Sequence, residues 1–105
     1  MQPTERIVRY YKQANDRSPF KEWIEGLDKK ARQIIFQRID RIRLGNFGDC
    51  RSLGSGIYEL RIFWGPGYRV YYGLRGIEMI ILLCGGDKSS QEKDIRKAHQ
   101  FWKEI

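Results

Sequence analysis

The sequence predicts an α+β fold in which an N-terminal strand and a helical hairpin pack on an antiparallel sheet, followed by a C-terminal helix. Apolar residues recur at helical spacing in the first half of the chain and near its end. Between residues 57 and 84 they alternate, as they do in strands. A length of 105 residues suits a single domain over residues 1–105 and is too short for two domains.

The N-terminal half carries the signals of one strand and two helices. An apolar and aromatic cluster at residues 7–11 precedes a polar stretch and predicts the first strand. Ser18 suits an N-cap and Pro19 the first helical position, so a short amphipathic helix should begin there. Asp28 can cap a second helix, which Gly45 ends.

The second predicted helix has an apolar face and a basic face. The chain has 20 Lys and Arg against 13 Asp and Glu, a formal net charge of +7 at pH 7, which indicates phosphate-rich or acidic partners. Basic side chains on one helix face can neutralise nucleic-acid phosphates. We therefore predict RNA-binding residues at Lys29, Lys30, Arg38 and Arg41.

The C-terminal half predicts three strands and a helix. Alternation and glycine-rich turns place the strands at residues 57–64, 68–73 and 77–84. The third run is apolar on both faces, so it should lie inside the sheet and be covered on each side. The final helix can supply that cover, and Ser89 with Glu92 predicts a capping box at its start.

The polar face of the predicted hairpin brings two arginines together. Both strands turn their apolar sides to one core only if the loop has an odd number of residues, as residues 65–67 provide. In that register Arg61 faces Tyr71, and Arg69 is its diagonal neighbour, with about 7–8 Å between the Cα atoms. Two guanidinium groups at that separation can hold one phosphate.

A third cation follows the inner strand. Gly85 and Gly86 are expected to let the chain leave that strand sharply and to bring Lys88 back toward the arginines. The motif is too short for a nucleotide-binding phosphate loop.

Two interpretations of this basic cluster stay open. Arg61 and Arg69 can be solvated strand residues that pair with Glu59 or a helix carboxylate, as surface charges commonly do. Alternatively, together with Lys88 and Tyr71, they form an anion-binding site.

Other chemistries find little support in the sequence. Cys50 and Cys84 lack the paired spacing of a zinc site and are expected to be reduced thiols. His99 is the only histidine, so neither a metal site nor a pair of catalytic histidines is expected, and no cofactor is implied. The 3 Trp residues fall on apolar stripes and are predicted to be core anchors rather than platforms for stacked bases.

The sequence predicts a cytoplasmic protein without a membrane segment. Its longest apolar run, residues 79–84, is far shorter than the roughly 20 residues that cross a bilayer. Residues 1–11 carry charges and lack the apolar stretch of a secretory signal.

Three segments together resemble the RelE/HigB-type toxins of bacterial type II toxin–antitoxin modules, most closely the branch described as addiction module killer proteins. The segments are YELRI at residues 58–62, GPGYRVYY at residues 65–72 and LCGGDKSSQ at residues 83–91. The resemblance covers nearly the whole chain. It implies a RelE/ParE-like fold and a ribosome-dependent mRNA endoribonuclease, an mRNA interferase that inhibits translation.

The resemblance also implies roles for individual residues. Arg61 and Arg69 match strand positions that hold the scissile phosphate in RelE-like toxins, and Lys88 matches the basic residue after the last strand. A 2′-hydroxyl would then attack the adjacent phosphate while the cations stabilise the transition state. Some relatives have a tyrosine proton carrier where this chain has residues 91–94, none of them tyrosine, so Tyr71 or Lys88 is expected to replace it.

Partners and alternative functions follow from the same resemblance. It implies a cognate antitoxin, a small helix-turn-helix protein from an adjacent gene that covers the basic face, with mRNA and the ribosome as targets. ParE-like members of the superfamily act on DNA gyrase, so inhibition of gyrase by binding is the alternative. A basic RNA-binding module without cleavage is the third interpretation.

Overall fold

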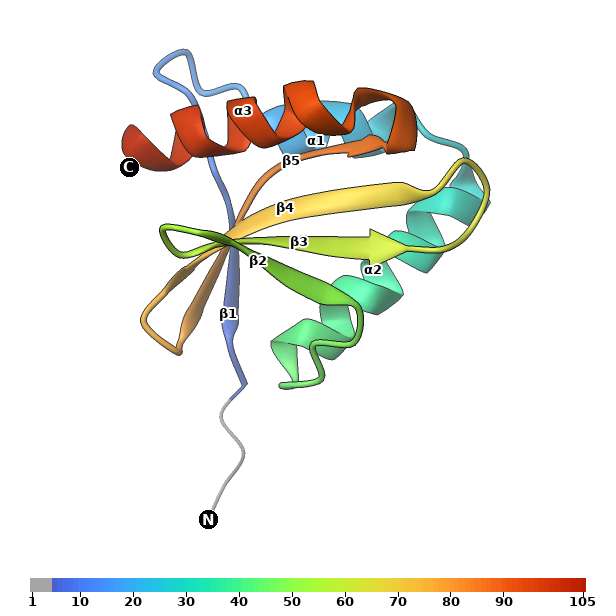
Figure 1. Ribbon diagram of the computed structural model, residues 1–105, viewed down its shortest axis with the longest axis horizontal. Helices are drawn as coiled ribbons and strands as arrows, with labels where there is room; N and C mark the ends of the chain where they lie inside the picture. The colour runs from blue at the N-terminus through green and yellow to red at the C-terminus, as the bar shows by residue number, and fades with distance from the viewer. Residues whose placement is uncertain (1–4) are drawn as a thin grey trace.

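Five strands form one sheet in the order β1-β5-β4-β3-β2 (Figure 1). The structure, a computed structural model, describes residues 5–105. In chain order the elements are β1 (Ile7–Tyr10), α1 (Pro19–Glu25), α2 (Lys29–Arg43), β2 (Cys50–Gly54), β3 (Ile57–Ile62), β4 (Tyr68–Arg75), β5 (Met79–Asp87), the 3₁₀ turn η1 (Lys88–Ser90) and α3 (Gln91–Lys103). β1 pairs with β5 in parallel, whereas all other neighbours are antiparallel. The α+β class is confirmed, but the sheet is mixed rather than wholly antiparallel.

The predicted starts of both hairpin helices are confirmed. The Ser18 hydroxyl accepts a hydrogen bond from the backbone N–H of Lys21 at 3.2 Å. The Asp28 carboxylate accepts one from Ala31 at 2.9 Å and caps α2 in the same way. Beyond α2 the chain passes through Gly45 at φ +96°, a conformation that favours glycine and turns the chain away from the helix axis.

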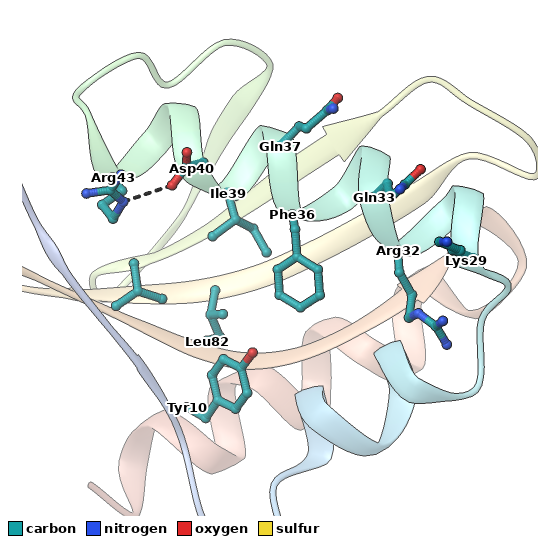
Figure 2. A pocket seen from close by; sticks show the side chains of 11 residues that line it. Tyr10, Lys29, Arg32, Gln33, Phe36, Gln37, Ile39, Asp40, Arg43 and Leu82 are labelled. Atoms are coloured by element: carbon teal, nitrogen blue, oxygen red, sulfur yellow. Dashed lines mark hydrogen bonds and ion pairs between the residues drawn. The ribbon is translucent and has the colours of Figure 1, made fainter.

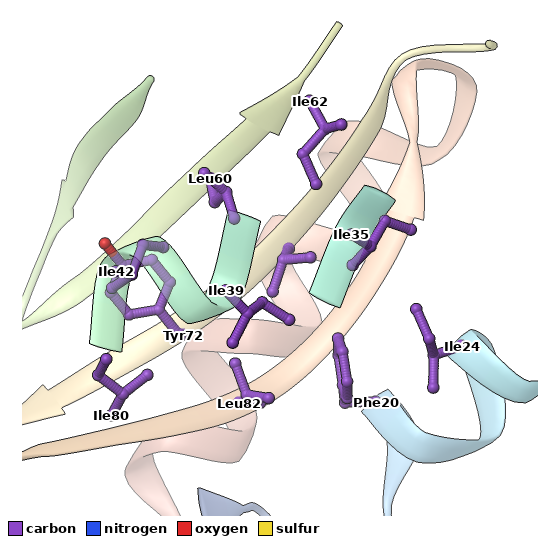
Figure 3. Packing of buried hydrophobic residues seen from close by; sticks show 11 residues of the cluster. Phe20, Ile24, Ile35, Ile39, Ile42, Leu60, Ile62, Tyr72, Ile80 and Leu82 are labelled. Carbon is purple, nitrogen blue, oxygen red and sulfur yellow. The ribbon is translucent and has the colours of Figure 1, made fainter. Parts of the chain in front are cut away.

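Each face of the sheet carries a hydrophobic core. Helices α1 and α2 cover one face and α3 covers the other. Figure 3 shows the first core, where Ile35 and Ile39 of α2 pack over strand residues such as Leu60. Tyr71 belongs to the second core and Tyr72 to the first, so the alternation predicted for β4 is confirmed.

The register between β3 and β4 differs from the prediction by two residues. Arg61 lies opposite Arg69, and Glu59 lies opposite Tyr71. The connecting loop spans residues 63–67, longer than expected but still odd in number, so the faces are as predicted and only the cross-strand partners change. The two arginines are therefore direct neighbours rather than diagonal ones.

Strand β2 carries no clear signal in the sequence. Its residues CRSLG are half-buried or exposed, because β2 lies at an edge of the sheet and pairs only with β3. A register shift between Ser52 and Gly54 further interrupts the pairing. A strand of this kind lacks the apolar alternation that marked its neighbours.

The helices are short and amphipathic. The longest, α2, has 15 residues and α3 has 13. In residues 5–105 no helix has both the length and the apolar character needed to cross a bilayer, which takes roughly 20 residues.

Candidate functional site

Three cationic side chains meet at one hollow at the end of the sheet, which we call the basic pocket. It has a volume of about 370 Å³. Its lining consists of Arg61, Ile62, Phe63, Trp64, Gly65, Pro66, Gly67, Tyr68, Arg69 and Lys88. Cross-strand pairing sets Arg61 beside Arg69. Lys88 arrives from the turn after β5, because the last residue of β5, Asp87, pairs with Tyr68 at the start of β4.

The cations of the basic pocket have little compensating charge. Among residues 5–105 Arg61 and Lys88 form no ion pair, and no carboxylate belongs to the pocket lining. The Nε atoms of Arg61 and Arg69 are buried without a hydrogen-bond partner. A buried donor without a partner is costly, and an anion in the pocket would supply an acceptor to Arg61, whereas the Nε of Arg69 faces Glu59. Arg69 does pair with Glu59, as the ion-pair interpretation expects. The absence of a carboxylate partner for Arg61 and Lys88 in residues 5–105 supports the anion-binding interpretation for the rest of the cluster.

Glu59 lies beneath the arginines and is completely buried. Its Oε2 accepts hydrogen bonds from the Tyr71 hydroxyl and the Gln91 side-chain amide, both at 3.0 Å. Its Oε1 accepts one from Arg51 at 3.1 Å. The Nε of Arg69 lies 3.8 Å from Oε2, close enough for attraction but too far for a hydrogen bond. Glu59 thus connects β2, β3, β4 and α3 under the pocket.

Tyr71 does not reach the basic pocket. Its side chain is completely buried and its hydroxyl donates to Glu59. Burial, together with the charge of Glu59, raises the pKa of Tyr71 well above its usual value. A phenol in this position stays protonated near neutral pH and has no path to a substrate, so its placement does not match the predicted role of proton carrier.

The glycines at the end of β5 do not turn the chain. The strand continues through Gly85 and Gly86 to Asp87, so the expected sharp exit is wrong. A Cβ at Gly85 would collide with the indole of Trp23, and one at Gly86 with the carboxylate of Asp94. Glycine is needed at both positions because side chains approach the backbone closely from opposite faces.

Lys88 sits on a short turn that its neighbours hold in place. The carboxylate of Asp87 accepts hydrogen bonds from the backbone N–H of Ser89 at 2.8 Å and from its hydroxyl at 2.5 Å. These bonds lower the pKa of Asp87 below its usual value. The capping box predicted at Ser89 and Glu92 is wrong, because Asp87 and Ser90 form it instead. The turn leaves the Lys88 side chain exposed at the pocket.

The predicted RNA-binding residues of α2 lie on the opposite face of the sheet from the basic pocket. Lys29, Lys30 and Arg41 are exposed. Arg38 is largely covered, and its Nη2 lies 4.0 Å from the carboxylate of Asp49. The structure therefore does not bring this set together with Arg61, Arg69 and Lys88.

A second hollow, of about 730 Å³, lies between β1 and α2, and we call it the α2 groove (Figure 2). Phe36 and Tyr10 contribute aromatic rings to it, while Arg32 and Lys29 add positive charge. Arg43 also lines it but is neutralised by Asp40 and Glu5. The groove thus combines an apolar floor with a basic end.

Two aromatic side chains that line the basic pocket lie outside both cores. Phe63 is 71% exposed and Trp64 is 37% exposed. Trp23 and Trp102 pack against the cores as predicted, so among the tryptophans only Trp64 departs from the expected role of core anchor. Its ring stacks on Tyr68 with a centroid distance of 6.3 Å.

Cysteine chemistry is not part of this site. Cys50 and Cys84 are free thiols, as predicted. Burial raises the pKa of Cys84 to about 12, which leaves it unreactive. In the described part of the chain, no group of three or more His, Cys, Asp or Glu side chains is arranged to hold a metal ion.

Comparison with known proteins gave two matches. Residues 22–103 match the protein family described as phage-derived protein Gp49-like (DUF891). A protein of Haemophilus influenzae, described as an uncharacterized protein, is 47% identical over 87 residues, which is 82% of this chain and 88% of that relative. The family match includes every residue of the basic pocket and all of α3.

Proposed function

This chain belongs to the family of phage-derived Gp49-like proteins, which are often toxin-like modules of toxin–antitoxin systems, and from that premise we propose that it is a RelE/HigB-type toxin that cuts mRNA on the translating ribosome. One observation carries the proposal: Arg61, Arg69 and Lys88 line a pocket whose lining has no carboxylate. Guanidinium groups bind phosphate oxygens through paired hydrogen bonds, so two adjacent arginines suit a phosphodiester.

The proposed reaction is an internal transfer within the RNA. The 2′-oxygen of a ribose forms a bond to the adjacent phosphorus, and the bond from phosphorus to the 5′-oxygen of the next nucleotide breaks. The products are a 2′,3′-cyclic phosphate and a 5′-hydroxyl. Arg61 and Arg69 stabilise the negative charge that develops on the phosphate oxygens. Lys88, the exposed amine of the pocket, donates a proton to the leaving 5′-oxygen, and the proton of the 2′-hydroxyl passes to solvent.

Inducible expression in a bacterial host, followed by sequencing of RNA 5′ ends, tests the proposal. We expect cuts within translated codons for the wild type and their loss in Arg69→Ala. Arg75→Ala removes an exposed arginine from the other end of β4 and is expected to cut like the wild type. Intact transcripts in growth-arrested cells would contradict the proposal. DNA damage without mRNA cleavage would instead favour the alternative, inhibition of DNA gyrase.

We also propose that a cognate antitoxin binds the α2 groove. The floor of the groove is apolar and its end is basic, which suits an apolar segment with acidic neighbours. Within residues 5–105 no strand pairs with the outer edge of β1, so the same segment can extend the sheet there. An antitoxin at this groove would contact the face of the sheet covered by α1 and α2, whereas Arg61 and Arg69 lie on the other face.

A further inference from the structure

The loop between β3 and β4 presents aromatic rings to solvent beside the basic pocket. Phe63 and Ile77 are the most exposed of the large hydrophobic residues in the described chain, at 71% each, and Trp64 follows Phe63 directly. Ile77 lies in the turn between β4 and β5 and lines neither the basic pocket nor the α2 groove, whereas Phe63 and Trp64 both line the basic pocket. An exposed aromatic pair next to a cluster of cations is a marker of a binding surface.

The Trp64 ring is held in place rather than left loose. The backbone N–H of Trp64 donates to Ile62 at 3.0 Å, and the N–H of Gly67 donates to Trp64 at 3.1 Å. The Trp64 ring stacks on Tyr68 with an interplanar angle of 24°. Tyr68 in turn contacts Trp23 edge-on, with centroids 6.0 Å apart, which ties the loop to α1. A fixed ring loses little conformational entropy when a flat ligand stacks on it.

The charges around the rings are those of a nucleic-acid site. The Arg61 guanidinium lies 5.7 Å from the centroid of the Phe63 ring. No acidic residue lines the pocket, so an acidic protein segment and a nucleic acid are both attracted, but only the latter offers a base and a phosphate together. Single-stranded nucleic acids bind where aromatic rings stack on bases beside a basic groove that holds the backbone.

We propose that Phe63 and Trp64 form a stacking site for an unpaired nucleobase adjacent to the phosphate held by Arg61 and Arg69. This inference rests on the proposed function, which makes the ligand single-stranded RNA. It adds a contact to the base next to the reacting phosphate. Because every base has an aromatic face, the site contributes affinity without reading sequence.

A binding cycle with an uncleavable probe isolates the stacking contribution. The probe is a short single-stranded 2′-deoxyoligonucleotide, used intact or with abasic positions that retain the phosphates, and its affinity is measured by fluorescence anisotropy. Phe63→Ala is expected to weaken binding of the intact strand by about 5- to 100-fold. The same variant should bind the abasic strand as the wild type does. Arg69→Ala should weaken binding of both strands, because it removes a phosphate contact.

The matched control is Ile77→Ala, which removes an equally exposed apolar side chain elsewhere and should leave both affinities unchanged. Equal affinity of the wild type for intact and abasic strands, including no binding to either, would overturn the stacking site. So would a Phe63→Ala variant that loses only its affinity for the antitoxin. If the measured affinities agree with these expectations while cells show no mRNA cuts, the stacking site is supported and the proposed nuclease activity is contradicted.

Discussion

The separation of Glu59 and Arg69 decides what the arginine can do. The Oε2 atom of Glu59 already accepts hydrogen bonds from Tyr71 and Gln91, so the guanidinium remains at 3.8 Å. At that distance the carboxylate attracts Arg69 without making the short paired bonds that would neutralise it. The Nη1 of Arg69 donates a hydrogen bond to the backbone carbonyl of Gly67 at 3.1 Å. We propose that Glu59 and this carbonyl together position Arg69 beneath the phosphate and leave its Nη2 for substrate.

Tyr71 has the corresponding role of holding Glu59 in place. Tyr71→Phe removes one donor from a buried carboxylate and should lower the free energy of unfolding by about 1–3 kcal/mol, measured by denaturant titration. Cleavage should fall by less than about tenfold, with the shape of its pH profile unchanged. A general acid or base would instead account for about 10²–10⁴ of the rate.

The control for this variant is Tyr58→Phe, on the opposite face of the sheet, which should change the free energy of unfolding very little. A loss of cleavage of 10²-fold or more in a Tyr71→Phe protein of normal stability would restore Tyr71 as the proton carrier.

The turn η1 is the element that sets the position of Lys88. Its geometry depends on Asp87, whose carboxylate accepts two hydrogen bonds from Ser89. These bonds form best with the charged carboxylate and hold its pKa below the model-compound value of 3.8. A group whose pKa is lowered on folding adds stability above its unfolded pKa and loses it as the pH falls through the folded value.

Asp87→Asn should therefore lower the stability of the protein at neutral pH but not in strong acid. Denaturant titrations of wild type and variant between pH 7 and pH 2 should show a difference that shrinks below about pH 4. Glu78→Gln removes a charge from the exposed turn between β4 and β5, where the structure of residues 5–105 gives Glu78 no ion pair; it is the control and should show no such convergence toward the wild type. A difference that stays constant over the whole range would contradict this account of the turn.

The helical elements were predictable from the sequence because their signals are local. Ser18 and Asp28 each cap a helix through a contact three residues away. The register of β3 against β4 was not predictable, since loops of three and five residues preserve the same faces. Nor was the bulge at Leu83, where Tyr71 pairs with Cys84 but Tyr72 pairs with Leu82. Such an insertion depends on packing from both faces and leaves no local signature.

The candidate site was predictable only in part for the same reason. Strand alternation sufficed to place Arg61 and Arg69 on one face. The central position of Glu59 depends on the true register and on Gln91, which approaches from α3. Trp64 lies outside both cores because β3 ends at Ile62, two residues earlier than the apolar alternation in the sequence predicts. Tertiary contacts, not local strand propensity, determine the position of Glu59 and the exposure of Trp64.

At the scale of the whole molecule, one basic surface lies at the end of the sheet and another lies over α2. The arginines of the basic pocket lie on the face covered by α3, whereas Ile62 and Tyr68, which also line the pocket, belong to the core on the other face. The α2 groove belongs to the face covered by α1 and α2. Two separate basic regions can bind different partners at the same time. We propose that RNA uses the first surface and the antitoxin the second.

Gln33→Glu should separate the two binding events. Gln33 is exposed and lines the α2 groove, so a negative charge there should repel an acidic antitoxin and weaken the complex by about tenfold, or about 1.4 kcal/mol. The affinity can be measured with the purified product of the neighbouring gene. Cleavage of mRNA without antitoxin should be unchanged. The same substitution on α3, Gln100→Glu, is the control, and equal weakening by both variants would argue against the groove.

The central claim is that the three cations act on a single phosphate attacked by its own ribose. A translation system of purified ribosomes, programmed with an mRNA carrying hydrogen in place of the 2′-hydroxyl at the mapped cut, tests it most directly. We expect cleavage at that position to stop while the protein still binds the stalled ribosome, because phosphate contacts do not need the hydroxyl. Continued cleavage of the substituted mRNA at the same position would contradict the mechanism.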